Sequence, residues 1–288
     1  MKILVTGGLG FIGSHLIELL LEEGNHEITV VDNLISESSS RENIRDGVKY
    51  YIEDIRNLEA IRFKDEFDIV FHLAALARIQ PSFKDPVKYF SIDAMGTCKV
   101  LDLARRHNAK LVYAGSSSAY GGPMLNPYAF AKYTGEQACE MYSKVYDMST
   151  VIARFFNVYG DRQPISGPYA TVVGVFEGQH ANGVTLTVTG TGEQRRDFTH
   201  VSDIVSGLRA LSEGEYRGDV YNLGTGKNYS INELAKMFEG AEIEYIPARP
   251  GEAKMTLADI TKTTADTGWE PKVRIQDYVK QCLSTVST

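Results

Sequence analysis

The sequence predicts an α/β protein, in which a Rossmann-type doubly wound parallel sheet is followed by a smaller mixed α/β domain. Short apolar segments alternate with longer amphipathic segments through the first half of the chain. The apolar segments are hydrophobic at successive positions, which is typical of parallel strands that are covered on both faces. A glycine-rich turn joins the first apolar segment to the first amphipathic one. Repeated strand–helix–strand units of this kind predict a doubly wound sheet.

The elements of the large sheet follow one another in regular order. The expected strands are residues 3–5, 28–31, 48–52, 69–73, 111–114 and 151–156. The expected helices are residues 11–23, 87–107 and 127–146. Pro127 is compatible with the first turn of the last helix, because the N–H that proline lacks has no helical partner there.

The pattern changes after about residue 160. Glycine, threonine and proline become denser, the apolar segments shorten, and residues 201–211 and 231–238 are expected as isolated helices. We therefore expect a Rossmann domain over residues 1–160 and a smaller domain over residues 161–288. Residues 219–224 are a candidate strand that could return to the large sheet.

The composition is that of an ordinary globular protein, and it excludes several classes. A formal net charge of -7 without a basic stripe argues against nucleic acid as a partner. The three cysteines and six histidines have no metal-ligand spacing, so we expect neither a disulfide framework nor a metal site. No apolar run approaches the roughly 18 residues of a membrane helix. The chain starts directly with the first expected strand, and we expect a cytoplasmic protein with no membrane partner.

The glycine-rich turn has the spacing of a dinucleotide-binding site. Gly7, Gly10 and Gly13 follow the first strand and open the first helix. Glycines there allow a tight turn, close approach of the backbone to a pyrophosphate, and close packing of the helix against the strand. The helix N-terminus then presents N–H groups and a partial positive charge to the pyrophosphate.

The acidic residue after the second strand indicates which dinucleotide binds. Asp32 lies 19 residues after Gly13 and can accept hydrogen bonds from both ribose hydroxyls, which favours NAD over NADP. Asp54, after the third strand, is a candidate for contact with the adenine. The alternatives are a structural glycine turn with a surface aspartate, and a solvated loop acid at Asp54. The residues expected to contact NAD are Gly7, Gly10, Phe11, Ile12, Gly13, Asp32, Asn33, Asp54, Ile55, Leu73, Ala74, Ala75, Tyr128 and Lys132.

A phenol and an ammonium group lie one helical turn apart in the third expected helix. Tyr128 and Lys132 have the i, i+4 spacing that places both on one face. A fixed cation favours the phenolate, so we expect Lys132 to lower the pKa of Tyr128 from its free value of about 10. Ser116 ends the fifth strand at the carboxyl edge of the sheet, where ligands of open α/β sheets bind. We expect Ser116, Tyr128 and Lys132 to be catalytic; the alternative is a chance YxxxK pattern in an ordinary helix.

With these motifs, the chain resembles the extended short-chain dehydrogenase/reductase family, within its nucleotide-sugar epimerase and dehydratase branch. The resemblance extends over almost the whole chain. Its further motifs are TGGLGFIGSHL (6–16), VVDNL (30–34), HLAALA (72–77), SSSAYG (116–121), RFFNVYG (154–160), RRDFTHVSD (195–203), NLGTG (222–226) and ARPGE (248–252). Within the family, the segments near the C-terminus are specific to enzymes that bind a nucleoside diphosphate sugar, so the second domain is expected to bind the substrate.

The resemblance also implies positions for parts of the substrate. The residues that would meet its diphosphate are Asn157, Arg196 and Arg249. The residues that would lie near its nucleobase are Thr187 and Thr189. An arginine fork suits diphosphate oxygens better than a flexible lysine does. The alternatives are an ion pair between Arg196 and Asp197, and a solvated loop cation at Arg249.

The residues after Ser116 favour one reaction of this branch. By resemblance, Tyr128 takes the proton of the sugar 4-hydroxyl while a hydride moves to NAD⁺, and Ser116 bonds to O4. Dehydratases of the family carry an Asp-Glu pair just after this position, and decarboxylases carry a glutamate there. Ser117 and Ser118 stand there instead, and neither is a general base near neutral pH without help. We therefore expect 4-epimerisation through a 4-keto intermediate, with both serines contacting the substrate.

Two other functions remain open from the sequence. One is another NAD-dependent nucleotide-sugar enzyme, a dehydratase or a reductase, and the other is a non-catalytic NAD-binding sensor. The expected substrate is a UDP-hexose or a UDP-N-acetylhexosamine, with GDP and dTDP as alternative carriers. Thr256 is small and stands where the epimerases limit the space beside the sugar ring, which suggests room for a 2-acetamido group.

The chain departs from the family pattern in two places. Only 11 residues separate Ser116 from Tyr128, fewer than in relatives, so we expect a more open site. Asp93 stands where relatives usually have asparagine, and an ionised carboxylate accepts hydrogen bonds but cannot donate them. By resemblance, the helices at 87–107 and 127–146 would form the bundle of a homodimer. Burial of Met141 or Tyr133 within one protomer is the alternative.

Overall fold

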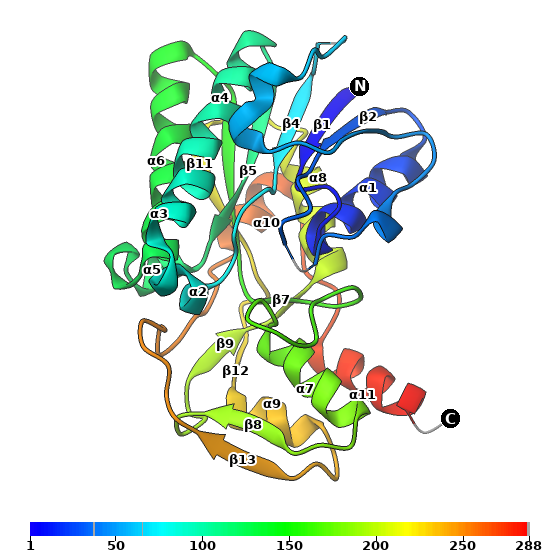
Figure 1. Cartoon of the computed structure of the whole chain (residues 1–288), viewed down its shortest axis with the longest axis vertical. Helices are drawn as coiled ribbons and strands as arrows, with labels where there is room; N and C mark the ends of the chain where they lie inside the picture. Colours follow the sequence, from blue (N-terminus) through cyan, green and yellow to red (C-terminus); the bar gives the residue numbers. More distant parts are fainter. Residues whose placement is uncertain (37, 65, 287–288) are drawn as a thin grey trace.

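The computed structural model describes residues 1–36, 38–64 and 66–286. Its main feature is a seven-stranded parallel sheet with the order β11-β6-β5-β4-β1-β2-β3 (Figure 1). The strands are β1 (Lys2–Thr6), β2 (Glu27–Val31), β3 (Lys49–Tyr51), β4 (Ile69–His72), β5 (Lys110–Ser116), β6 (Thr150–Phe155) and β11 (Arg217–Leu223). The strand order reverses at β1, which pairs with β2 on one side and β4 on the other. The predicted Rossmann-type sheet is thereby confirmed, and ligands of such sheets bind at this reversal.

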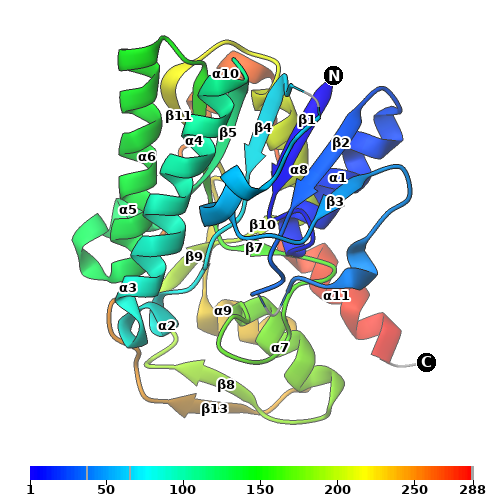
Figure 2. The same ribbon diagram turned by 45° about the horizontal axis from the view of Figure 1, so that its top comes forward.

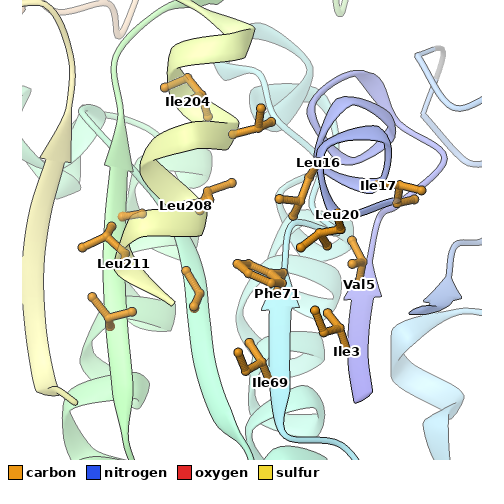
Figure 3. Packing of buried hydrophobic residues seen from close by; sticks show 14 of the residues in the cluster. Ile3, Val5, Leu16, Ile17, Leu20, Ile69, Phe71, Ile204, Leu208 and Leu211 are labelled. Carbon is orange, nitrogen blue, oxygen red and sulfur yellow. The ribbon is translucent and has the colours of Figure 1, made fainter. Parts of the chain in front are cut away.

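Helices cover both faces of the sheet (Figure 2). One layer contains α1 (Phe11–Glu23) and α8 (Val201–Leu211), and the other contains α4 (Thr97–Arg106) and α6 (Pro127–Tyr146). Successive side chains of a strand point to opposite layers, so both strand faces are apolar and the strand sequences read as continuous hydrophobic runs. The α1 and α8 layer meets the sheet through Ile3, Val5, Leu16, Ile17, Leu20, Ile69, Phe71, Ile204, Leu208 and Leu211 (Figure 3).

Three helices begin and end at the predicted residues, and one expected helix is interrupted. Helices α1, α6 and α8 have the predicted bounds. The region 87–107 instead contains α3 (Pro86–Tyr89), a π-helical segment (Phe90–Gly96) and α4. Helical structure is thus confirmed over nearly the whole predicted range, but the wider π turn was not predicted; beside that turn the Thr97 hydroxyl donates to the Asp93 carbonyl at 2.6 Å. Segments of this kind occur frequently at functional sites.

The second lobe contains three helices and three small two-stranded sheets, with a core of its own. Its helices are α7 (Val172–Ala181), α9 (Ile231–Met237) and α11 (Ile275–Val286). Its strand pairs are β7 (Val158–Tyr159) with β10 (Thr199–His200), β8 (Leu186–Thr189) with β13 (Ile243–Ile246), and β9 (Arg195–Asp197) with β12 (Asn228–Ser230). In Figure 1 this lobe lies below the large sheet, at the edge where the glycine-rich turn and Ser116 are found.

Not every segment after residue 160 belongs to this lobe. Strand β11 pairs with β6 at the edge of the large sheet, and α10 (Thr261–Thr267) packs beside it. Helix α8 covers the large sheet together with α1. Three elements after residue 160, α8, β11 and α10, therefore pack with the first lobe. The division of the chain into domains at residue 160 remains a prediction. Within the described residues, no helix has the length and apolarity needed to cross a membrane.

Candidate active site

A cavity of about 450 Å³ lies between the carboxyl edge of the sheet and the second lobe. This volume is in the range of small-molecule sites. The predicted site residues that line it are Gly7, Gly10, Phe11, Ile12, Gly13, Asp32, Asn33, Ile55, Leu73, Ala74, Ala75, Ser116, Ser117, Ser118, Tyr128, Lys132, Asn157, Thr187, Thr189, Arg196, Arg249 and Thr256. The fold thus brings both predicted sets, cofactor and substrate residues, to one cavity. The individual ligand contacts remain predictions.

The glycine turn approaches its neighbours too closely for side chains. Gly7 has φ +75°, and a Cβ there would lie 2.7 Å from the backbone nitrogen of Ala74. A Cβ on Gly13 would lie 2.2 Å from the carbonyl oxygen of Gly7. Gly10 is the N-cap residue of α1, and no side chain caps the helix. The first N–H groups of α1 are therefore available to an anion in the cavity.

The carboxylate of Asp32 is held in place at the end of β2. Asp32 is 6% exposed, and it accepts hydrogen bonds from the backbone N–H groups of Leu9 (3.0 Å) and Leu34 (2.8 Å). Burial raises its pKa, and these hydrogen bonds oppose the shift. The alternative of a surface aspartate beside a structural turn is wrong, because this residue is buried and directed at the turn.

Asp54 is the one predicted cofactor residue that does not line the cavity. Its carboxylate accepts hydrogen bonds from the side chains of Arg56 (2.8 Å) and Asn33 (2.8 Å). The hydrogen bonds from Arg56 hold the pKa of Asp54 at about 2. Neighbouring Glu53 and Ile55 line the cavity instead, so the structure places an acid and an apolar side chain beside the expected position of the adenine.

Ser116 and Tyr128 meet at the end of β5. The Tyr128 hydroxyl donates to Ser116 Oγ at 3.3 Å, and the Ser118 N–H donates to the same oxygen at 3.2 Å. Asn126 caps α6 by accepting from the Ala129 N–H at 2.8 Å, which fixes the turn that carries Tyr128. One turn later, Lys132 donates to the Ala114 carbonyl at 2.8 Å. A chance YxxxK pattern in an ordinary helix would not explain why the Tyr128 hydroxyl is directed at Ser116.

The pKa of Tyr128 differs from the expectation. Burial raises it above its ordinary value, while the hydrogen bond to Ser116 and the nearby Arg78 cation lower it. The expected net lowering by Lys132 is not found in the protein alone, because desolvation of the phenolate outweighs the stabilising groups. Burial also lowers the pKa of Lys132, with Asp93 and Glu136 opposing that shift.

The short loop between Ser116 and Tyr128 is tied to the second lobe. It forms α5 (Ser118–Gly121) and a 3₁₀ turn (Pro123–Leu125). The Asn126 amide donates to the Gly251 carbonyl at 3.0 Å, and the Gln80 amide donates to the Pro250 carbonyl at 2.9 Å. The segment at residues 250–251 thus lies against this loop and α2 (Ile79–Lys84). An open site remains an expectation, but this edge of the cavity is bridged.

Asn157 and Thr256 are joined to each other. The Asn157 amide donates to the Asp197 carbonyl at 3.1 Å and to Thr256 Oγ1 at 3.2 Å. Asn157 has φ +21°, an uncommon conformation for a residue with a side chain. Strained backbone of this kind is found at ligand sites when the surrounding contacts fix it.

Arg196 has a carboxylate partner other than the one considered from the sequence. Its guanidinium contacts Glu252 at 3.4 Å and donates to the Arg195 carbonyl at 2.9 Å. The carboxylate of Asp197 instead accepts from the N–H groups of Thr225, Gly226 and Ala258, at 2.9 to 3.1 Å. An ion pair between Arg196 and Asp197 is therefore excluded. Burial lowers the pKa of Arg196, and Glu252 opposes this shift.

The remaining substrate candidates lie on β8 and on the segment after β13. Thr187 is paired with Gln179 through its N–H (3.0 Å) and its hydroxyl (2.9 Å). Thr189 accepts from Gln194 at its carbonyl, at 2.9 Å. Arg249 is exposed in its loop and lines the cavity. The structure is therefore compatible both with diphosphate binding by Arg249 and with a solvated loop cation.

Several polar residues of the cavity were not predicted from the sequence, among them Arg78, Gln80, Asn126 and Glu252. Arg78 and Gln80 follow the HLAALA motif directly, so the end of β4 was the available signal. Asn126 had a signal as well, since asparagine before proline is typical of a helix N-cap. Glu252 reaches Arg196 across a separation of 56 residues, and nothing local in the sequence indicates that contact.

These features together define a class of enzyme. A glycine turn after the first strand, a buried acid after the second, and a Ser–Tyr–Lys set at the carboxyl edge define a dinucleotide-dependent short-chain dehydrogenase/reductase type. The family model of NAD dependent epimerases and dehydratases matches residues 3–224. The chain belongs to the NAD dependent epimerase/dehydratase family.

Individual relatives are similar over nearly their full length. A Methanocaldococcus jannaschii protein provisionally named UDP-glucose 4-epimerase is 34% identical, over 98% of this chain and 97% of its own. UDP-glucuronic acid decarboxylase 5 of Arabidopsis thaliana is 33% identical, over 96% and 86%. The crystal structure of UDP-glucose 4-epimerase from Thermotoga maritima with UDP-glucose has a TM-score of 0.91 and 29% identity, with 100% of both chains covered. The predicted family and NAD-dependent enzyme class are confirmed.

The residues present fit NAD. A Cβ on Gly13 would meet the backbone of Gly7 and Gly8, as expected for the glycine that lets α1 pack closely against the turn of a dinucleotide site, and Gly7, Gly10 and Gly13 all line the cavity. Asp32 lies at the end of β2 with its carboxylate fixed, where it can meet a ribose diol. No cluster of three or more metal-ligating side chains is found in the part of the chain that the structure describes.

Proposed function

We propose that this protein catalyses the NAD-dependent 4-epimerisation of a UDP-hexose or UDP-N-acetylhexosamine through a 4-keto intermediate. The observation that carries the proposal is the set of hydroxyls beside Tyr128: Ser116, Ser117 and Ser118 all line the cavity. Elimination of the 6-hydroxyl requires a carboxylic acid or base at this position, and a serine supplies neither near neutral pH. A 4-keto sugar held among hydroxyls therefore has hydride return as its simplest outcome.

Bound NAD supplies hydride acceptance from C4 and hydride return to C4. Ser116 Oγ lies 3.3 Å from the Tyr128 hydroxyl, so both oxygens can hold the sugar O4 between them. Tyr128 removes the O4 proton as C4 is oxidised and donates it back on reduction. Lys132 lies one turn after Tyr128 on the same face of α6, and its ammonium is anchored at the Ala114 carbonyl of β5.

The second lobe is proposed to hold the carrier while the sugar turns. Arg196 and Arg249 would pair with the diphosphate, and Asn157 would meet it by exchanging one of its two present acceptors, the Asp197 carbonyl or Thr256 Oγ1. Thr187 and Thr189 would lie beside the base, for which UDP is proposed. The Thr256 hydroxyl accepts a hydrogen bond from the Asn157 amide. Because the Thr256 side chain is small, we propose that a 2-acetamido group fits beside the sugar ring. A fixed diphosphate with a mobile sugar allows C4 to present either face to the cofactor.

The direct test is proton NMR of the NAD-loaded protein in heavy water. UDP-glucose, UDP-galactose, UDP-GlcNAc and UDP-GalNAc would be supplied separately. We expect conversion between 4-epimers without deuterium in the ring, because the hydride returns from the cofactor. A 4-keto-6-deoxy product that carries deuterium at C5 would refute the argument from the serines. Absence of turnover with all four would contradict the proposed substrate range.

We also propose that the protein forms a homodimer through α4 and α6. Met141, Val145 and Tyr146 on α6 are 43%, 63% and 50% exposed, so burial of Met141 within one protomer is excluded. Apolar side chains exposed along one helix are typical of an interface. Sedimentation of the protein should give a dimer, and Val145→Asp should shift it to a monomer. A monomeric parent protein at micromolar concentration would contradict this proposal.

A further inference from the structure

Arg78 is a partly buried cation in the active-site cavity, and it has no anionic partner among the described residues. It follows β4 and lines the same cavity as Ser116 and Tyr128. Its Nε donates to the Tyr169 carbonyl at 2.6 Å, which joins the two lobes. Across residues 1–36, 38–64 and 66–286, the guanidinium forms no other hydrogen bond and no ion pair. Four of its five N–H donors therefore remain available.

Two other cations of the cavity have nearby anions, and Arg249 is exposed to solvent. Arg196 contacts Glu252 at 3.4 Å, and Lys132 is influenced by the negative charges of Asp93 and Glu136. Around Arg78, the groups with electrostatic influence are the phenols of Tyr128 and Tyr89. Burial lowers the pKa of Arg78, although a guanidinium remains charged at neutral pH.

A partly desolvated charge without a partner is costly, and a ligand that supplies an anion removes this cost. The diphosphate is not the obvious candidate, because Arg196, Arg249 and Asn157 are proposed to bind it from the second lobe. Arg78 is the N-cap residue of α2, which packs against α6, the helix that carries Tyr128, so it lies on the side of the cavity where O4 is expected. The substituents nearest O4 are those on C3 and C5 of the sugar. An anion bound by Arg78 would therefore be carried next to the reacting carbon.

We propose that Arg78 binds a carboxylate carried on C3 or C5 of the sugar, so that the substrate is an acidic UDP-sugar. This inference rests on the proposed function, because the position of O4 at Tyr128 defines which substituents reach Arg78. Two sources share this chemistry: the C6 carboxylate of a hexuronate and the carboxylate of a lactyl ether on O3. A guanidinium suits either one, since it pairs with a carboxylate through two parallel hydrogen bonds. The buried Ser118 hydroxyl, which has no partner among the described residues, is a further donor in this cavity.

The test is calorimetric titration of the NAD-loaded full chain with UDP, UDP-glucose, UDP-glucuronate and UDP-N-acetylmuramate. We expect at least one acidic sugar to bind about 10- to 100-fold more tightly than UDP-glucose. In Arg78→Gln this ratio should fall to near one, and in Arg78→Lys it should fall partly because the fork is lost. Arg274→Gln removes a guanidinium that is 75% exposed, and this control should match the parent protein.

Each outcome has a definite meaning. A preference for UDP-glucuronate alone assigns the C6 carboxylate, and a preference for UDP-N-acetylmuramate alone assigns the lactyl group. If the parent protein epimerises neutral UDP-sugars and shows no acidic preference, the inference is wrong and the proposed function stands. An Arg78-dependent preference without epimerisation of any UDP-sugar would refute the proposed function and keep the carboxylate site. A loss of NAD or UDP affinity in Arg78→Gln equal to the loss for acidic sugars would assign Arg78 to phosphate binding instead.

Discussion

The two sides of the cavity are built differently. On the sheet side, the functional groups come from continuous segments: Gly7, Gly10 and Gly13 from one turn, and Tyr128 and Lys132 from one helix face. On the other side, two of the groups are held by distant segments. Asn157 bonds to Thr256 across 99 residues, and Arg196 contacts Glu252 across 56. Local elements thus fix the chemistry, whereas long-range contacts of the second lobe hold the substrate groups. Substitutions on the two sides should therefore affect different kinetic constants.

The largest effect is expected on the sheet side, from Tyr128→Phe. Removing the hydroxyl leaves O4 without its proton acceptor, so kcat should fall by about 10³-fold or more, within the range of general acid–base contributions. Turnover at saturating substrate measures this. NAD and UDP affinity should remain close to the parent values, because the ring is retained.

The matched control is Tyr133→Phe, which lies on the same helix outside the cavity. Its kcat should stay within about twofold of the parent, as is usual for surface substitutions. Equal losses in both variants would mean that α6 is merely destabilised. A fully active Tyr128→Phe would favour the NAD-binding sensor over an enzyme.

The next effect is steric and concerns the cofactor. In Gly13→Ala, the added Cβ would lie 2.2 Å from the Gly7 carbonyl oxygen, so the turn must shift. We expect a loss of about 1–3 kcal/mol in the free energy of unfolding and a loss of NAD affinity. Thermal unfolding with and without NAD measures both quantities.

Gly24→Ala is a control that distinguishes the effect of backbone strain from the effect of disturbing the glycine turn. Gly24 also has a positive φ, +75°, but no atom lies within 4 Å of its added Cβ. It should cost roughly 1–2 kcal/mol through backbone strain and leave the NAD-induced stabilisation intact. If Gly13→Ala retained the same NAD-induced stabilisation, the turn would not be the pyrophosphate site.

The sheet side of the cavity was predicted well from the sequence, because the motifs that form it are local. Strand ends, a glycine turn and an i, i+4 pair depend on neighbouring residues, and helices α1 and α6 were located to the residue. The pKa of Tyr128 was not predicted, because burial depends on tertiary packing around α6. Arg78 was missed since a lone arginine carries no spacing signal. Its meaning appears only when the fold shows that no acid faces it.

The side of the cavity that the second lobe forms was predictable only through the family resemblance. Its strands β7, β8, β9, β10, β12 and β13 have two to four residues each, too few for a clear alternation. The alternative considered for Arg196 was an ion pair with the adjacent Asp197, whose carboxylate accepts from Thr225 and Gly226 instead. Proximity in sequence was misleading there, because neighbouring side chains on β9 point to opposite faces.

A moderate effect is expected on this second side, from Arg196→Gln. If Arg196 pairs with the diphosphate, its loss should raise KM about 10- to 100-fold and change kcat far less, since binding is lost equally in ground and transition states. Glu252 would also lose its partner. Initial-rate kinetics with UDP-glucose separate the two constants.

Arg195→Gln is the adjacent control. Arg195 pairs with Glu233 and Asn228 and does not line the cavity, so its loss should lower stability with little change in KM. A fall in kcat alone for Arg196→Gln would contradict the division of roles between the two sides.

The last effect concerns Asp93 and depends on pH, so that it is small at acidic pH and grows as the pH rises. Burial raises the pKa of Asp93 to about 7, and one of its oxygens has no hydrogen-bond partner among the described residues. A carboxyl with a raised folded-state pKa favours folding in its neutral form, so the protein loses stability as pH rises from about 4 through about 7. Asp93→Asn removes this loss. Its free energy of unfolding should exceed that of the parent by up to about 4 kcal/mol more near pH 8 than near pH 4.

The same substitution should shift catalysis. The groups that face Asp93 include Lys132, the phenols of Tyr89, Tyr113 and Tyr128, and the N–H of Leu76. Its negative charge raises the pKa of Tyr128, so a neutral amide should move the rising limb of the kcat profile to lower pH, by less than about one unit. Denaturant titrations and rates between about pH 5 and 9 measure both effects. Parallel curves for the two proteins would show that Asp93 is uncharged throughout and acts on Tyr128 by packing alone.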